Sequence, residues 1–229
     1  MRKSDSFFLN AILSFSGGLQ DAYTFNVRGR VFANAQTGNV VLMSQNFMSG
    51  NWAKGVDYLV PIMSFVLGIA VADFIEHNHK KGTRVHWRQV VVFFEMLLLI
   101  GVGFIPAGYK MVPNMLVSFT CAMQVHSFRR VNGVKYASTM CIGNLTTATE
   151  NLSEGFRSRD HKALYNALNL FGIIAFFAIG AGLGGVLSGK IGVETIWISA
   201  ALLIVAIVLM FQIRHEPAGI ISTEEQNVQ

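Results

Sequence analysis

The sequence predicts an all-α integral membrane protein with about six transmembrane helices and two shorter re-entrant half-helices. Of its 229 residues, 52% are hydrophobic and only 14% are charged, whereas a soluble domain carries about a quarter of charged residues. Apolar segments long enough to cross a hydrocarbon core of ~30 Å recur along the whole chain. Two of these segments carry too many polar side chains to face lipid along their length, which singles them out as the half-helices.

The apolar segments fall into two sets of four. The first set spans residues 7–27, 31–48, 58–76 and 89–105, and the second spans residues 112–130, 136–152, 163–187 and 195–213. Segment 7–27 follows a charged start, as in a signal peptide, but no cleavage site follows it, so we expect it to remain as the first span. We expect a single membrane domain over residues 1–229, with a polar, disordered tail at 214–229.

A single shift relates the two sets and predicts an internal repeat. Gly-Asn pairs at residues 38–39 and 143–144 fix this shift at 105 residues. The same shift carries Asn46 to Asn151 and Gly50 to Gly155. Weak hydropathy symmetry of this kind is expected of transporter folds that are built from repeats. We therefore predict one repeat at about residues 7–106 and a second at about residues 112–213.

The two polar segments, residues 31–48 and 136–152, are predicted to contain the half-helices. Asparagine is a preferred helix N-cap and glycine is preferred just past a helix end. In each segment a glycine follows the asparagine by eleven positions, which predicts a helix of roughly 16 Å. The chain would enter these helices through non-helical stretches at residues 31–38 and 136–143, which membrane depth tolerates only inside protein or along a cavity. The alternative is that both segments are complete, buried spanning helices.

The distribution of Lys and Arg favours the re-entrant alternative. With the N-terminus inside and both polar segments re-entrant, thirteen of the eighteen Lys and Arg residues lie on the inner side, as the positive-inside rule requires. If both segments cross, the better orientation divides the same residues ten to eight. The favoured topology places both termini in the cytoplasm and inverts the second repeat. The asparagine ends of the two half-helices would then meet near the midplane.

Asp21 is the first candidate for a functional residue, because an ionisable group within a span is a functional-site hypothesis by default. The alternative is a position near the helix end or a structural hydrogen bond. The 105-residue shift maps Asp21 onto His126, and such a pair would relay protons because histidine titrates near neutral pH. The alternative for His126 is a satisfied histidine at a helix end beside Arg129 and Arg130.

Glu95 is a further candidate, one to two turns inside segment 89–105. The asparagine ends of the half-helices would bring positive helix-dipole ends to the midplane. Such ends attract anions, whereas Asp21 and Glu95 attract cations. The sequence therefore leaves the charge of the solute open.

Several function classes are not expected. The net charge is +5, but the basic residues lie in short clusters between apolar segments, which membrane topology explains better than nucleic-acid binding. Cys121 and Cys141 have no paired spacing and no histidine at metal-ligand distance. No serine or cysteine nucleophile has a base at motif spacing. We expect no nucleic-acid partner, no metal, no cofactor, no catalytic residue and no enzymatic activity.

Two motifs resemble the signature of the YoaK-like family of small bacterial membrane proteins, a domain of unknown function. They are Gly17-Gly18-Leu19-Gln20-Asp21-Ala22 and Phe32-Ala33-Asn34-Ala35-Gln36-Thr37-Gly38-Asn39. The resemblance runs from about Phe7 to Arg214. The family tends to carry a threonine-rich Thr-Gly motif in its second half, where this chain has Met-Cys-Ile-Gly-Asn at residues 140–144. A function for a threonine at position 142 is therefore in doubt. The resemblance implies a bacterial inner-membrane protein with about six spans and no established activity.

The sequence as a whole predicts a transporter or channel for a small polar or charged solute. The alternatives are a non-transporting membrane scaffold or subunit and, less favoured, an intramembrane enzyme. The residues expected to line the pathway are Asp21, Gln36, Thr37, Asn39, His126 and Asn144, with Glu95 as a further candidate. The expected partners are the lipid bilayer and the solute or ion. Because six spans make a thin wall around a pathway, a homodimer is an option by analogy.

Overall fold

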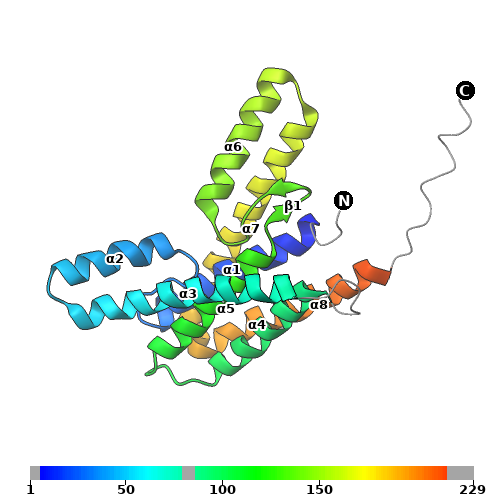
Figure 1. The fold of residues 1–229 in the computed structure, drawn as a ribbon. Coiled ribbons are helices and arrows are strands. Elements are labelled where there is room, and N and C mark those ends of the chain that lie inside the picture. Colours follow the sequence, from blue (N-terminus) through cyan, green and yellow to red (C-terminus); the bar gives the residue numbers. More distant parts are fainter. Residues whose placement is uncertain (1–5, 79–85, 216–229) are drawn as a thin grey trace, which may run out of the picture.

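The computed structural model describes residues 6–78 and 86–215, except for the side chains of residues 212–215. Within these residues the chain forms eight α-helices, a short β-hairpin and a 3-10 helix (Figure 1). The elements are α1 Phe7–Val27, α2 Gln36–Met48, α3 Trp52–Asn78, α4 Trp87–Gly103, α5 Met111–Ser127, β1 Arg130–Val131, β2 Val134–Lys135, α6 Cys141–Ser158, α7 His161–Ile191, η2 Gly192–Thr195 and α8 Ile196–His215. The predicted all-α class is confirmed, with one helix for each apolar segment.

The β-hairpin between α5 and α6 was not predicted. β1 and β2 pair antiparallel, with Val131 opposite Val134. The connecting residues Asn132 and Gly133 have φ angles of 49° and 88°, and Asn-Gly is a strong signal for this kind of turn. Most of the predicted tail lies outside the described residues. So do Lys80, Lys81 and Arg84, which are among the thirteen basic residues predicted on the inner side.

The helices pack in matching pairs. α1 packs against α7 and α8, and α5 packs against α3 and α4. α2 runs along α3, α6 runs along α7, and α4 packs against α8. In Figure 1, α2 and α6 extend away from the rest of the helices in different directions, each beside its partner in a helical hairpin. Their first turns therefore lie near the centre of the molecule and their last turns lie far from it.

Glycines allow the backbones of crossing helices to touch. A Cβ atom at Gly18 would lie 2.1 Å from a backbone carbonyl oxygen of α7, and one at Gly180 would lie 2.1 Å from a carbonyl oxygen of α1. At Gly68 of α3, a Cβ atom would lie 2.3 Å from the carbonyl oxygen of Phe119 on α5. The glycines of α1 and α7 therefore allow these two helices to cross closely, and Gly68 allows α3 to approach α5.

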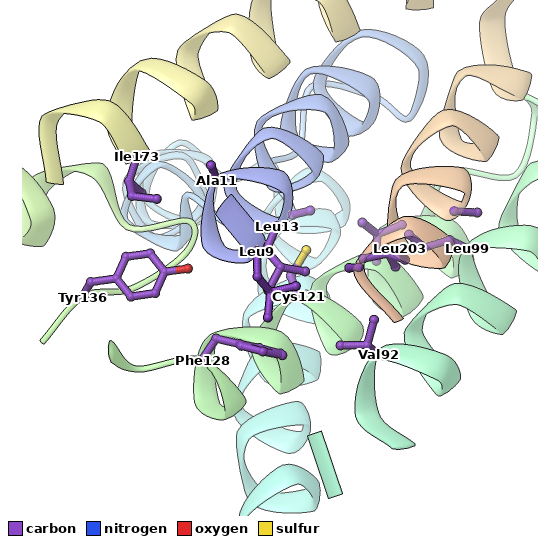
Figure 2. Close-up of a cluster of buried hydrophobic side chains, with 14 of the residues drawn as sticks. Leu9, Ala11, Leu13, Val92, Leu99, Cys121, Phe128, Tyr136, Ile173 and Leu203 are labelled. Carbon is purple, nitrogen blue, oxygen red and sulfur yellow. The ribbon is translucent and has the colours of Figure 1, made fainter. Parts of the chain in front are cut away.

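The interior combines apolar and polar side chains. Figure 2 shows Leu9 and Leu13 of α1 near Cys121 of α5, and Leu203 of α8 near Leu99 of α4. Between these apolar contacts the interior holds polar groups. Fully buried polar side chains of α1 alone include Asn10, Ser14, Ser16, Gln20 and Thr24. Such groups are normally on the outside of a soluble protein.

The exterior is apolar over long stretches. Phe74 is 69% exposed, Leu168 66%, Leu67 57% and Ile179 53%. By length and composition, α3 is able to cross a membrane, and so is the stretch His161–Phe211, which runs through α7 and most of α8. The described residues therefore contain two candidate spanning stretches. The six-span arrangement with two half-helices remains a prediction.

Candidate functional site

The chain segments that precede α2 and α6 are held by the same hydrogen-bond pattern. The Asn39 side chain accepts from the backbone N–H of Phe32 at 3.0 Å and donates to the Phe32 carbonyl oxygen at 2.6 Å. The Asn144 side chain bonds both backbone groups of Ala137 in the same way, at 2.9 and 2.7 Å. Each asparagine thus joins the first turn of its helix to a residue seven positions earlier and fixes how the chain enters the helix.

These two asparagines are not helix N-caps, so that prediction was wrong. α2 begins at Gln36 and α6 at Cys141, and each asparagine is the fourth residue of its helix. The non-helical entry stretches are therefore shorter than predicted, at residues 31–35 and 136–140. The physical reason is that each side chain bonds back across the entry stretch rather than to the free amides of its own first turn.

The predicted helix ends are right for α2 and wrong for α6. Gly50 follows α2 with a φ of 78°, and the 13 residues of α2 span about 20 Å, which is short of a hydrocarbon core. Gly155 lies inside α6, where a Cβ atom would be 2.6 Å from the Leu164 side chain. This glycine serves helix packing, and α6 continues to Ser158 for 18 residues, or about 27 Å. α6 is thus much longer than the predicted eleven residues.

A cavity of about 680 Å³ lies where the first turns of α2 and α6 approach α1 and α7. Its polar wall is formed by Asp21, Asn34, Gln36, Thr37 and Thr139. The cavity thus brings together groups from both repeats predicted from the sequence. Because α2 and α6 both begin at this wall, the partial positive charge of two helix N-termini acts on the same space.

Aromatic rings form much of the apolar wall. Phe25, Phe32 and Phe177 line the cavity together with Ala181. The rings of Phe25 and Phe32 stack with centroids 4.9 Å apart. The cavity therefore combines a polar wall at the helix starts with an aromatic wall provided by α1, α7 and the segment before α2.

Asp21 lies at the junction of α1 with the segment before α2. Its Oδ1 accepts a hydrogen bond from the backbone N–H of Asn34 at 2.7 Å, and the amides of Ala33 and Ala35 interact with the same carboxylate. The Asn34 side chain in turn donates to the carbonyl oxygen of Gly17 at 3.0 Å. The carboxylate is 6% exposed. It therefore holds the segment before α2 while also facing the cavity.

Two polar side chains in the cavity wall have oxygen atoms without a partner. Asn34 and Thr139 are 3% and 5% exposed, and neither Asn34 Oδ1 nor Thr139 Oγ1 has a hydrogen-bond partner among the described residues. A buried polar atom is costly to leave unpaired. Both oxygens are covered by neighbouring atoms, and a rotation of the side chain would be needed for either one to accept from a group in the cavity.

The structure groups some of the predicted pathway residues and separates others. Asp21, Gln36 and Thr37 line the cavity. Asn39 and Asn144 lie behind its wall, where they hold the two entry segments. Asn34 and Thr139 were missed as site residues. The signal that finds them is the 105-residue shift itself, since it relates these two positions inside the two predicted entry stretches.

His126 lies apart from this cavity. It is buried in the last turn of α5, where its Nε2 is 3.1 Å from Glu76 Oε2 of α3 and 3.6 Å from Asp73 Oδ1. Its ring also contacts the Arg129 guanidinium. This environment corresponds to the alternative of a histidine satisfied at a helix end. A role in a pathway beside Asp21 stays a prediction.

Glu95 is also separate from the cavity. This side chain is fully buried on α4, and its Oε1 accepts from Gln20 Nε2 of α1 at 3.3 Å. The Gln124 side-chain amide satisfies its hydrogen-bonding neighbours when its oxygen accepts from Ser138 Oγ. Its nitrogen then donates to both Glu95 carboxylate oxygens at 3.3 Å. The carboxylate thus joins α1, α4 and α5 through side-chain amides.

Within residues 6–78 and 86–215, no cluster of three or more His, Cys, Asp or Glu side chains has the arrangement of a metal site. Among known families, residues 9–209 match the one described as "Protein of unknown function (DUF1275)". The matched range agrees with the resemblance to the YoaK-like family over about residues 7–214. Neither a curated protein nor a solved structure gives a significant match.

Proposed function

The chain belongs to this family of unknown function, and we propose that it is a multi-pass membrane protein that moves a small polar or charged solute through the cavity at Asp21. The observation that carries the proposal is the convergence of two helix N-termini and one buried carboxylate on a cavity of about 680 Å³. Irregular backbone and ionisable groups inside a membrane domain are typical of solute pathways. The chain would do this without a cofactor and without enzymatic chemistry.

The distribution of polarity supports a position across a bilayer. Phe74 of α3, Leu168 of α7 and Phe104 at the end of α4 are more than 60% exposed, while Gln20 and Glu95 are fully buried. Apolar exposure of this extent is rare on a soluble monomer, whereas lipid is a good solvent for it. With the charge bias of the sequence, this supports the bacterial inner membrane with both termini in the cytoplasm.

The helix packing supports an inverted repeat with about six spans. In an inverted repeat the helices α1 to α4 correspond in order to α5 to α8, so each contact in one half should have an equivalent. The α1–α7 contact corresponds to α5–α3, the α1–α8 contact to α5–α4, and the α2–α3 contact to α6–α7. The α4–α8 contact is its own equivalent, and all of these pairs are in contact. The equivalent bonds of Asn39 and Asn144 follow the same correspondence. In this proposal α2 and α6 enter from opposite faces.

Cys141 allows a test that does not require the solute to be known. Its side chain lines the cavity and is partly exposed, whereas Cys121 is buried in the core. In a Cys121→Ala background, a membrane-impermeant methanethiosulfonate reagent is applied to right-side-out and to inverted vesicles. A pathway open in turn to both faces predicts modification of Cys141 from both sides. Modification from one side only would contradict it.

A non-transporting scaffold is the second candidate, and the Asp21–Asn34 bond favours it. If the carboxylate only anchors the segment before α2, Asp21→Asn would lower the melting temperature of the protein and Cys141 would not be reached from both faces. Asp57→Asn is the matched control, because Asp57 is exposed and pairs only with Lys54 among the described residues. A pathway predicts that Asp21→Asn loses transport and Asp57→Asn keeps it, and that Cys141 is reached from both faces in the background without Cys121.

A homodimer is also part of the proposal. α6 extends outward beside α7 (Figure 1), exposes Glu150 and Arg157 and leaves Glu154 partly exposed. These side chains cannot face lipid at depth without a large cost in free energy. A second copy that covers the polar face of α6 would remove this cost where the face lies in the bilayer.

A further inference from the structure

We propose that the cavity beside Asp21 binds a small zwitterion with an apolar body, its ammonium group at Asp21 and its carboxylate at the start of α6. This inference rests on the proposed transport function and names the class of solute. It is carried by the charge balance of the cavity, by a difference between the two helix starts, and by the aromatic wall.

The charge balance favours a solute without net charge. Asp21 is the one carboxylate or basic group among the residues that line the cavity. Each helix N-terminus is equivalent to roughly +0.5 elementary charge, so the starts of α2 and α6 together offset about one carboxylate. A solute with net charge would bring an unbalanced charge into a mainly apolar site, which is costly. A solute with two opposite charges is not penalised in this way.

The two helix starts are not equivalent, and this difference orients the solute. The start of α2 already has an anion, because Asp21 accepts from the amide of Asn34. The position related to Asp21 by the repeat is His126, which pairs with Glu76 away from the cavity. The start of α6 therefore lacks a matching anion. A carboxylate from the solute would take that place, as helix N-termini bind anions.

The first turn of α6 has free donors for such a carboxylate. The amides of Cys141, Ile142 and Gly143 have no acceptor among the residues that the structure describes. These three residues line the cavity. The opposite pole has the Asp21 carboxylate, which lines the cavity. An ammonium group has three donors, and Asn34 Oδ1 and Thr139 Oγ1, which lack partners within the described part of the chain, would accept from it after a rotation of their side chains.

The remaining wall fits an apolar body. Phe25, Phe32 and Phe177 line the same cavity as the two poles. A volume of about 680 Å³ exceeds the need of a single polar ion and is in the range of cavities for small organic molecules. Aromatic faces also favour a nearby ammonium group. The cavity therefore fits an α-amino acid with an apolar side chain better than an inorganic ion.

Binding to the purified protein tests this with three probes of one carbon skeleton. L-Leucine carries both poles, isopentylamine lacks the carboxylate, and 4-methylvalerate lacks the ammonium group. The full chain in lipid nanodiscs is titrated with each probe by calorimetry, and protection of Cys141 from thiol modification is followed in parallel. We expect leucine to bind and to protect Cys141, and each analogue to bind at least about tenfold more weakly, because each loses charge-assisted hydrogen bonds.

Two variants sharpen the result. Asp21→Asn is expected to lose leucine binding and to gain affinity for 4-methylvalerate, because the two helix starts are then no longer offset. Asp57→Asn is the control and should bind leucine as the unmodified protein does. Thr139→Val keeps the methyl group that packs against Gly17 and removes one acceptor. It should weaken leucine binding several-fold without changing the melting temperature, and it serves if Asp21→Asn does not fold.

Three outcomes would overturn the inference. Amine binding as tight as that of leucine would mean a cation site, and acid binding as tight would mean an anion site. If no probe binds although Cys141 reacts from both faces of the membrane, the zwitterion inference fails while the transport proposal stands. If leucine binds and Cys141 reacts from one face only, the inference stands and transport fails.

Discussion

The segment that joins α1 to α2 and the segment that joins α5 to α6 end alike and begin differently. Both end in the same asparagine bridge, made by Asn39 in one case and Asn144 in the other. The first segment is anchored by the buried charges of Arg28 and Asp21. The second begins with a β-hairpin, and the shift of 105 residues places Gly133 where the first has Arg28. The helix start is thus a shared element of both halves, and the buried charges belong to the first alone.

The largest expected effect concerns the side of the membrane on which α2 and α6 end. Asn51 lies just past α2 and Ser158 is the last residue of α6, and both are exposed. Single cysteines at these positions, in a background without Cys121 and Cys141, should react with an impermeant reagent from opposite sides. We expect Asn51→Cys to label only from outside and Ser158→Cys only from inside. Labelling of both from the same side would refute the inverted repeat.

The second effect concerns Arg28, which has no counterpart in the second half. Its guanidinium is fully buried and donates to the carbonyl oxygens of Ile105 and Pro106 at 2.7 and 2.8 Å. Further bonds reach Val102 and Tyr109. Arg28→Met would remove this donor from all four carbonyls at and after the end of α4, and those of Val102 and Pro106 would keep only their backbone donors. Because hydrogen bonds to a charged group contribute about 1.5–3 kcal/mol each, we expect a loss of at least about 3 kcal/mol in the free energy of unfolding, measured by denaturant titration in mixed micelles.

Arg157→Met is the control for Arg28→Met. The Arg157 side chain is 74% exposed and pairs with Glu154 one turn away. Exposed ion pairs of this kind contribute ~0–1 kcal/mol. A loss for Arg28→Met no greater than that of the control would show that the first segment does not depend on its buried cation.

The smallest effect tests whether the asparagine bridge is equivalent in the two halves. Asn39→Ala and Asn144→Ala each remove two hydrogen bonds to the entry segment, and we expect each to lower the free energy of unfolding by about 2 kcal/mol. Asn39→Ala also removes a bond to Gln36 Oε1 at 2.9 Å, which adds at most about 1 kcal/mol. Asn46→Ala and Asn151→Ala are matched controls, because these side chains bond only the carbonyl one turn earlier in their own helices. Losses that differ several-fold between Asn39→Ala and Asn144→Ala would contradict equivalence.

Much of the fold could be predicted from the sequence, because long apolar stretches indicate where the helices lie. The first predicted segment, residues 7–27, has the same limits as α1. The Gly-Asn pairs correctly indicated two special helix starts. They did not give the residue at which each helix begins, because asparagine has two ways to stabilise a helix start. It caps free amides in one, and in this protein it bonds back to the backbone of the entry segment.

The site was predicted in part, and its limits have a physical cause. Asp21, Gln36 and Thr37 share a cavity because Asp21 of α1 bonds the segment that leads directly into the first turn of α2. The bonding partner of His126 depends on where α3 ends relative to α5. No local pattern in the sequence predicts how the end of α3 is placed relative to α5. The shift that relates His126 to Asp21 gives equivalent positions in two halves, and equivalent positions need not be neighbours.

The asparagine bridges also determine how the walls of the cavity can move. Each one closes a ring of eight residues, 32–39 and 137–144, so each entry segment turns as one rigid body with the start of its helix. In the first half this ring is also tied to α1, because Asp21 accepts from the amide of Asn34 inside it. α1, the entry segment and the first turn of α2 would therefore move together, and a shift of one of these walls would be transmitted to the others.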